Sequence, residues 1–136
     1  MLKPMMRALT GDGGKHAAIR VLVVEDDPQV RGVIEETFAE AGYEVEAADS
    51  VEAGMTLIQS AEFDIIIADG RLGDGTGMEI ADAAWERDIP TLLVTAYAFD
   101  LLREKRNLAS YNVLQKPVRP AQLMMAAKAL LKLRKG

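Results

Sequence analysis

Apolar residues follow two alternating patterns along this chain from residue 19 onward. Continuous apolar runs, which are typical of strands buried on both faces, occupy residues 21–24, 63–68 and 90–95. Shorter apolar stretches at 45–47 and 113–114 predict two further strands. Each predicted strand is followed by a polar segment and then by apolar residues at helical spacing, which predicts an amphipathic helix.

The expected helix boundaries carry residues that cap or start helices. Asp27-Pro28 places an N-cap before a proline in the first helical turn, and Gly42 ends the same helix. Ser50 is the candidate N-cap of the second helix, and Pro120 opens the last one. The apolar stripes of the helices consist, in chain order, of Val30, Val33, Ile34 and Phe38; Ala53, Leu57 and Ile58; Ile80, Ala81, Ala84 and Trp85; Leu101 and Leu102, a weaker stripe; and Leu123, Ala127, Leu130 and Leu131.

This alternation predicts five strand–helix units and therefore an α/β fold. In such folds a parallel sheet is packed between two layers of helices, and the crossover connections are right-handed. The chain has 136 residues, which is the length of one domain. Residues 1–18 show no sustained period and contain Gly11, Gly13 and Gly14. We therefore expect a flexible N-terminal arm over residues 1–18 and one domain over residues 19–136.

Composition excludes several classes of function. The chain has no cysteine, which excludes disulfide scaffolds, thiol nucleophiles and zinc–thiolate sites. Its 16 basic and 21 acidic residues give a net charge of −5, so we expect no binding to nucleic acid. No apolar run approaches the ~18 residues that a membrane-spanning helix needs, so we expect no membrane association either.

Charged and hydroxyl side chains stand at the expected carboxyl ends of four strands. Open α/β sheets bind ligands at this edge, so these side chains are expected to converge there. They are Glu25, Asp26 and Asp27 after the first strand, Asp69 after the third, Thr95 at the end of the fourth and Lys116 after the fifth. Each residue alone has an ordinary explanation, such as a helix cap for Asp27 or a turn for Asp69-Gly70. Their joint placement indicates a functional site.

The residue types at this edge favour phosphoryl chemistry assisted by a metal ion. The first strand–helix turn, EDDPQV, has three acids and no glycine, so it would repel the pyrophosphate of a dinucleotide. Clustered carboxylates suit a hard divalent cation, above all Mg²⁺. An aspartate beside this metal could attack a phosphoryl group and form an acyl phosphate. Mg²⁺ and Lys116 would supply positive charge, and Thr95 could donate a hydrogen bond to a phosphoryl oxygen.

Four segments together resemble the receiver domain of two-component response regulators, the CheY-like family. They read VLVVEDDP, IIIADGRLGDGTG, LLVTAYA and VLQKP, and the resemblance covers residues 19–134. It implies a doubly wound, flavodoxin-like (βα)5 fold. This fold is a three-layer sandwich whose five-stranded parallel sheet has the strand order 2-1-3-4-5.

The resemblance also implies roles for the residues at the sheet edge. The phosphoryl chemistry would belong to Asp69 as the phosphoacceptor, Thr95 as the switch hydroxyl and Lys116 as the contact to the phosphoryl group. Glu25 and Asp26 would form the acidic pair of the family. Asp26 and Asp69 would hold Mg²⁺ directly, together with the backbone carbonyl of Arg71, and Glu25 would act through a water molecule.

The chain departs from the family pattern at two places. The loop after the phosphoacceptor carries Gly73 where receivers typically have proline, although the later Gly77 is kept, so we expect a looser loop. Val113 stands where many receivers carry the aromatic residue of the switch. Tyr111 should share a strand face with Val113, but we expect the switch to run through the backbone of residues 97–99.

By this resemblance the chain is a phosphorylatable switch rather than an enzyme with its own substrate turnover. A sensor histidine kinase or a histidine phosphotransfer protein in the cytoplasm would donate the phosphoryl group. A homodimer could form through the fourth helix, the fifth strand and the fifth helix. Two alternatives stay open. A degenerate receiver would bind proteins without taking phosphate, and a haloacid-dehalogenase-like phosphatase would need a second aspartate at the position of Arg71.

Overall fold

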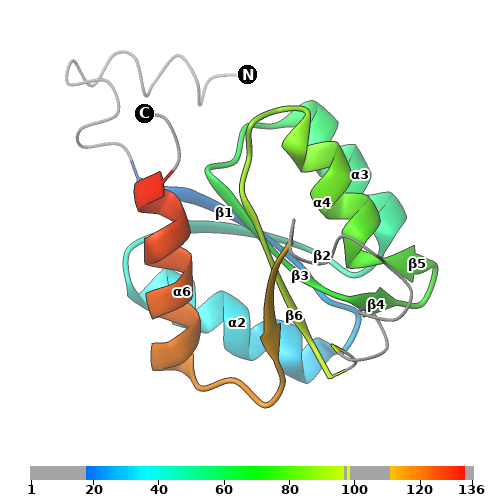
Figure 1. Cartoon of the computed structure of the whole chain (residues 1–136). Helices are drawn as coiled ribbons and strands as arrows, with labels where there is room; N and C mark the ends of the chain where they lie inside the picture. The colour runs from blue at the N-terminus through cyan, green and yellow to red at the C-terminus, as the bar shows by residue number, and fades with distance from the viewer. Residues whose placement is uncertain (1–17, 97, 99–110, 134–136) are drawn as a thin grey trace, which may run out of the picture.

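The computed structural model describes residues 18–96, 98 and 111–133 (Figure 1). The strands in this part of the chain are β1 (Arg20–Val24), β2 (Glu44–Ala48), β3 (Ile65–Asp69), β4 (Arg71–Leu72), β5 (Gly75–Thr76), β6 (Thr91–Thr95) and β7 (Asn112–Gln115). The helices are α2 (Pro28–Glu40), α3 (Val51–Ser60), α4 (Gly77–Trp85) and α6 (Pro120–Leu133). The expected arm up to residue 17 and the helix expected around Leu101 and Leu102 lie outside the described residues.

The five longer strands form one parallel sheet in the order β2-β1-β3-β6-β7 (Figure 1). Numbered along the chain without the two short strands, this order is 2-1-3-4-5, as predicted. Helices α3 and α4 cover one face of the sheet, and α2 and α6 cover the other (Figure 1). The structure therefore confirms the α/β class and the three-layer, flavodoxin-like arrangement.

The apolar core consists of two clusters, one on each face of the sheet. In β1, Leu22 and Val24 belong to the cluster under α3 and α4, whereas Val21 and Val23 belong to the cluster under α2 and α6. Successive side chains of a strand point to opposite faces, so a strand covered on both sides is apolar throughout. This explains why continuous apolar runs marked β1, β3 and β6 in the sequence.

Two helix starts predicted from capping residues are confirmed. The Asp27 carboxylate accepts hydrogen bonds from the backbone N–H groups of Gln29 (2.9 Å) and Val30 (3.2 Å). Ser50 Oγ accepts a hydrogen bond from the backbone N–H of Ala53 at 3.0 Å. These bonds start α2 and α3 a few residues after β1 and β2, because each cap satisfies N–H groups that the first helical turn leaves unpaired.

The structure differs from the sequence predictions in several details. Val33, expected on the apolar stripe of α2, is 54% exposed. Strand limits shift by one or two residues, so that β3 begins at Ile65 rather than at residue 63. The loop after β3 contains an antiparallel hairpin, β4 with β5, that the apolar pattern did not predict because strands of two residues show no period. Trp85, expected on the apolar stripe of α4, is 79% exposed. It is the last residue of α4 and lies about 100° around the helix from the buried Ala84.

Among the described residues, none of the helices is both long enough and apolar enough to cross a lipid bilayer.

Candidate functional site

The predicted site residues stand at the carboxyl edge of the parallel sheet. Their positions are Glu25 directly after β1, Asp69 as the last residue of β3, Thr95 as the last residue of β6 and Lys116 directly after β7. The strand register aligns these ends, since Asp69 pairs with Val94 and Thr95 pairs with Gln115. Residues that are far apart in the sequence therefore meet at one edge, as the parallel topology requires.

Three acids gather closely at this edge. One carboxylate oxygen each of Glu25, Asp26 and Asp69 lies within 4.8 Å of the others. Glu25 is buried, Asp69 is half-buried and Asp26 is exposed, so the group opens to solvent on one side. Oxygen donors at this spacing fit a hard divalent cation such as Mg²⁺, which prefers carboxylates and retains several waters.

Lys116 joins two of these acids. Its Nζ lies 3.0 Å from Glu25 Oε1 and 3.1 Å from Asp69 Oδ2, and donates a hydrogen bond to each. Its backbone N–H donates to the carbonyl oxygen of Thr95 at 2.8 Å, which places the lysine beside the end of β6. The ammonium group thus bridges the carboxylates of Glu25 and Asp69.

Burial and charge oppose each other in the ionisation of Glu25 and Lys116. Burial raises the pKa of Glu25 well above its ordinary value, although hydrogen bonds from Lys116 and from the backbone N–H of Asp27 act in the opposite direction. Burial alone would lower the pKa of Lys116, but its contacts with Glu25 and Asp69 raise that pKa overall. The lysine is therefore charged at neutral pH.

The loop that follows Asp69 is tightly fitted to it. The backbone N–H of Arg71 donates to Asp69 Oδ1 at 3.2 Å, so the Arg71 backbone lies beside the carboxylate. The N–H of Gly77 donates to the carbonyl oxygen of Gly70 at 3.0 Å. A Cβ atom at Gly77 would overlap the carbonyl oxygen of Asp69 and would lie 2.9 Å from Leu93. Glycine is therefore required at residue 77 for steric reasons.

The tip of the same loop is anchored to a helix. The Asp74 carboxylate accepts hydrogen bonds from the backbone N–H groups of Val51 (2.8 Å) and Glu52 (3.0 Å), the first two residues of α3. We expected a looser loop because Gly73 stands in place of proline. The contact of Asp74 with α3, which that expectation left out, ties the loop to the helix.

Thr95 ends β6, and the candidate switch residues Val113 and Tyr111 lie in and just before the neighbouring strand β7. The side chain of Thr95 is completely buried, and Val113 is half-buried against the cluster under α3 and α4. The hydroxyl of Tyr111 donates to Asp82 Oδ1 at 2.7 Å. Burial, together with this bond, raises the pKa of Tyr111 to about 12. The segment 97–99, in which we expect the switch, lies outside the described residues except for Ala98, so that expectation stays a prediction.

Two side chains that sequence reasoning did not single out contact the backbone of the site. Arg31 Nη1 donates to the carbonyl oxygen of Glu25 at 2.9 Å, and Gln115 Nε2 donates to the carbonyl oxygen of Ala96 at 3.1 Å. Both bonds stabilise the loops that leave the sheet edge. No local pattern could have found them, because side chains of either type are common on exposed helices and strand ends.

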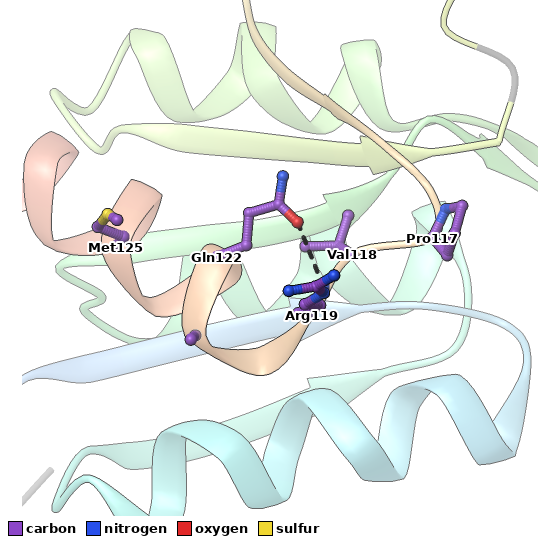
Figure 2. A pocket seen from close by; sticks show the side chains of 6 residues that line it. Pro117, Val118, Arg119, Gln122 and Met125 are labelled. Carbon is purple, nitrogen blue, oxygen red and sulfur yellow. Dashed lines mark hydrogen bonds between the residues drawn. The ribbon is translucent and has the colours of Figure 1, made fainter.

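One hollow lies beside the site rather than in it. Figure 2 shows this hollow at the start of α6, with Pro117, Val118, Arg119, Gln122 and Met125 around it and a hydrogen bond from Arg119 N–H to Gln122 Oε1 (3.4 Å). Its volume is about 750 Å³, and none of the acids lines it. A second hollow, of about 580 Å³, runs between α2 and the end of the sheet and includes Lys116 in its lining.

The chain belongs to the receiver domains of two-component response regulators, because the family described as "Response regulator receiver domain" matches residues 21–128. Among curated proteins the chain is similar to the response regulator protein PilR of Pseudomonas aeruginosa, with 27% identity over 118 residues. That match covers 85% of this chain and 26% of PilR. The chain therefore spans about a quarter of the length of this relative.

Solved structures agree with the family assignment. The chain is similar to a CheY-like response regulator receiver domain protein from Methanospirillum hungatei JF-1, with 27% identity and a TM-score of 0.76 over 85% of this chain and 95% of that one. It is also similar to the response regulator TrrA from Thermotoga maritima in complex with Mg(2+)-BeF. That match has 27% identity and a TM-score of 0.72, and it covers 82% of this chain and 98% of the other.

Proposed function

We propose that this chain is a phosphoacceptor switch in which Asp69 receives a phosphoryl group from a phosphohistidine. The observation that carries the proposal is the position of Lys116 Nζ, within 3.1 Å of both Asp69 and Glu25, beside three acids that together fit a metal ion. Membership of the receiver family supports the same function. The switch changes state when Asp69 is modified and turns over no substrate of its own.

Phosphoryl transfer to Asp69 exchanges a P–N bond of the donor for a P–O bond. An Asp69 carboxylate oxygen attacks the phosphorus atom and forms a P–O bond, while the P–N bond of the donor histidine breaks. The electron pair of that bond returns to the imidazole nitrogen, which then takes up a proton. Lys116 stabilises the negative charge on the phosphoryl oxygens, and Thr95 donates a hydrogen bond to one of them after transfer.

The donor set at the sheet edge fits Mg²⁺ by its chemistry. Asp26 and Asp69 would hold the ion directly together with the backbone carbonyl of Arg71, and Glu25 would contribute through a water molecule. When bound, the ion supplies positive charge that offsets the repulsion between the attacking carboxylate and the phosphoryl oxygens. The complex of the similar protein TrrA with Mg(2+)-BeF supports this proposal.

Removing Mg²⁺ is expected to suppress phosphorylation by acetyl phosphate. Without the ion, the acids at the edge repel the incoming phosphoryl group, and Lys116 alone balances only part of their charge. The measurement is the rate of phosphoryl gain by intact mass spectrometry, with MgCl2 and with excess EDTA. Adding MgCl2 back after EDTA should restore the rate, whereas equal rates in both conditions would refute the metal role.

We also propose a docking place for the donor protein. The hollow that includes Lys116 is mainly apolar and is lined on the α2 side by Val30, Val33 and Ile34. Val33 is 54% exposed, so its side chain is accessible to a partner protein. Since this hollow borders the site, a kinase or phosphotransfer protein seated there would bring its phosphohistidine close to Asp69.

Val33→Glu is expected to slow phosphotransfer from a protein donor and leave labelling by acetyl phosphate unchanged. A charge in an apolar contact costs binding energy, and the expected slowing is on the order of tenfold. The protein donor is the phosphorylated histidine kinase that labels the wild-type chain fastest among those of the source organism. Trp85→Glu is the matched control, because Trp85 is also exposed but lies on α4, at the opposite face of the sheet. If Val33→Glu slowed labelling by the kinase and by acetyl phosphate equally, the docking assignment would be contradicted.

We propose a homodimer that uses the helix expected around Leu101, together with β7 and α6. Of this face, β7 and α6 are described, and Met125 and Leu133 of α6 are exposed at 69% and 81%. Exposed apolar side chains on a helix favour a protein contact there. We propose that the switch domain comprises residues 19–136 and works in the cytoplasm. We propose no contact of this domain with nucleic acid or with a membrane.

A further inference from the structure

One side chain joins the loop after β3 to the start of α3. The two oxygens of Asp74 accept hydrogen bonds from the backbone N–H groups of Val51 (2.8 Å) and Glu52 (3.0 Å). The next N–H of α3, on Ala53, donates to Ser50 Oγ at 3.0 Å. The N-terminus of α3 is therefore capped twice, by its own preceding serine and by an aspartate from a distant loop.

The contact made by Asp74 is charge-assisted. Its hydrogen bonds from Val51 and Glu52 lower the pKa of the Asp74 carboxyl below its ordinary value, so the side chain is ionised at neutral pH. A carboxylate at the N-terminal end of a helix also interacts favourably with the helix dipole. The tip of the loop is thus held by a stronger contact than a neutral cap would provide.

The hairpin connects this anchor to the phosphoacceptor. Asp74 lies in its turn, and the strands pair Leu72 with Gly75 and Arg71 with Thr76. At the base of the hairpin, the Arg71 N–H donates to Asp69 Oδ1 at 3.2 Å. Two paired positions separate the turn from the base, so a displacement of the tip would move the Arg71 backbone. Leu72 is also buried in the same cluster as Val51, which keeps the hairpin against α3.

We propose that Asp74 is a positioning residue for the phosphoryl site, because its bonds to α3 hold the Arg71 backbone beside Asp69. The inference rests on the proposed function, in which the Arg71 carbonyl is a Mg²⁺ ligand. Partners that orient the ligands of a metal affect its affinity although they do not touch it.

Three variants separate positioning from simple helix capping. Asp74→Ala removes both bonds to α3, and Asp74→Asn keeps one carbonyl oxygen as an acceptor. Ser50→Ala is the matched control, because it removes the local cap of the same helix and leaves the hairpin contacts intact. Denaturant unfolding measures the stability of each variant. Hydrogen exchange of the Arg71 amide, without metal, reports the position of the loop, and titration with MgCl2 followed by NMR reports metal affinity.

Asp74→Ala is expected to speed exchange of the Arg71 amide and to weaken MgCl2 binding about tenfold, the lower end of the range for such partners. For Asp74→Asn, the exchange rate of the Arg71 amide and the affinity for MgCl2 should lie between those of the wild type and those of Asp74→Ala. Ser50→Ala should lower the free energy of unfolding but leave the exchange rate of the Arg71 amide and the affinity for MgCl2 at their wild-type values. Equal effects of Asp74→Ala and Ser50→Ala would show that Asp74 is only a helix cap and would overturn the inference. If the wild type binds no Mg²⁺, the proposed metal role fails, while the exchange comparison still decides whether Asp74 positions the loop.

Discussion

Replacing Asp69 by asparagine is expected to abolish covalent phosphorylation by acetyl phosphate and Mg²⁺. The amide keeps the shape of the side chain but lacks the anionic oxygen that attacks phosphorus, and it weakens the acidic metal site. The fold should persist, because Lys116 retains its hydrogen bond to Glu25. Intact mass spectrometry after a fixed incubation measures the loss, which should reach the background level.

Asp49→Asn is the matched control for this variant. Asp49 is an exposed acid directly after β2, at the same edge of the sheet as Asp69. Its replacement makes the same change of charge at this edge without touching the proposed nucleophile. We expect the wild-type rate for Asp49→Asn. Labelling of Asp69→Asn at the rate of the control would exclude Asp69 as the acceptor.

Gly77→Ala is expected to damage the fold and the site together. The new Cβ would overlap the carbonyl oxygen of Asp69, a backbone atom that no rotamer change can move away. The loop must therefore shift, which strains the bond from Gly77 N–H to the Gly70 carbonyl. Overpacking of this kind lowers the free energy of unfolding by about 1–3 kcal/mol. Since Asp69 is displaced as well, the phosphorylation rate should also fall in the fraction that remains folded.

Gly73→Ala tests the same loop where space is available. A Cβ at Gly73 would meet nothing within 4 Å. We therefore expect a change in unfolding free energy within about 0.5 kcal/mol and an unchanged phosphorylation rate. Denaturant unfolding and acetyl phosphate labelling measure both quantities. If Gly77→Ala behaved like Gly73→Ala, the steric fit of the loop to Asp69 would not be a requirement of the site.

Much of the fold could be predicted from the sequence because its strongest signals are local. Buried parallel strands are continuous apolar runs, and caps such as Asp27 and Ser50 stand directly before the helices they start. The convergence of Glu25, Asp69 and Lys116 followed from the same topology, since parallel strands place their carboxyl ends at one edge. Their mutual distances, however, depend on side-chain packing and became visible only in the structure.

The features that were not predicted depend on contacts between distant segments. Asp74 caps α3 from a loop more than twenty residues later in the chain, and no spacing rule links it to Val51. Arg20, the first residue of β1, was not singled out in the sequence, yet it is 4% exposed. Its guanidinium donates to the Glu62 carbonyl and the Glu46 carboxylate (2.8 and 2.7 Å). Buried charges of this kind are held by tertiary partners that apolar periodicity does not reveal.

The most direct test of the central claim is to locate the phosphoryl group on the wild-type chain. After incubation with acetyl phosphate and Mg²⁺, borohydride reduction converts an aspartyl phosphate to homoserine, which peptide mass spectrometry then places in the sequence. We predict homoserine at residue 69 and unmodified aspartate at residue 26. Homoserine at another position, or a chain that gains no phosphoryl group at all, would contradict the proposal that Asp69 is the phosphoacceptor of this receiver domain.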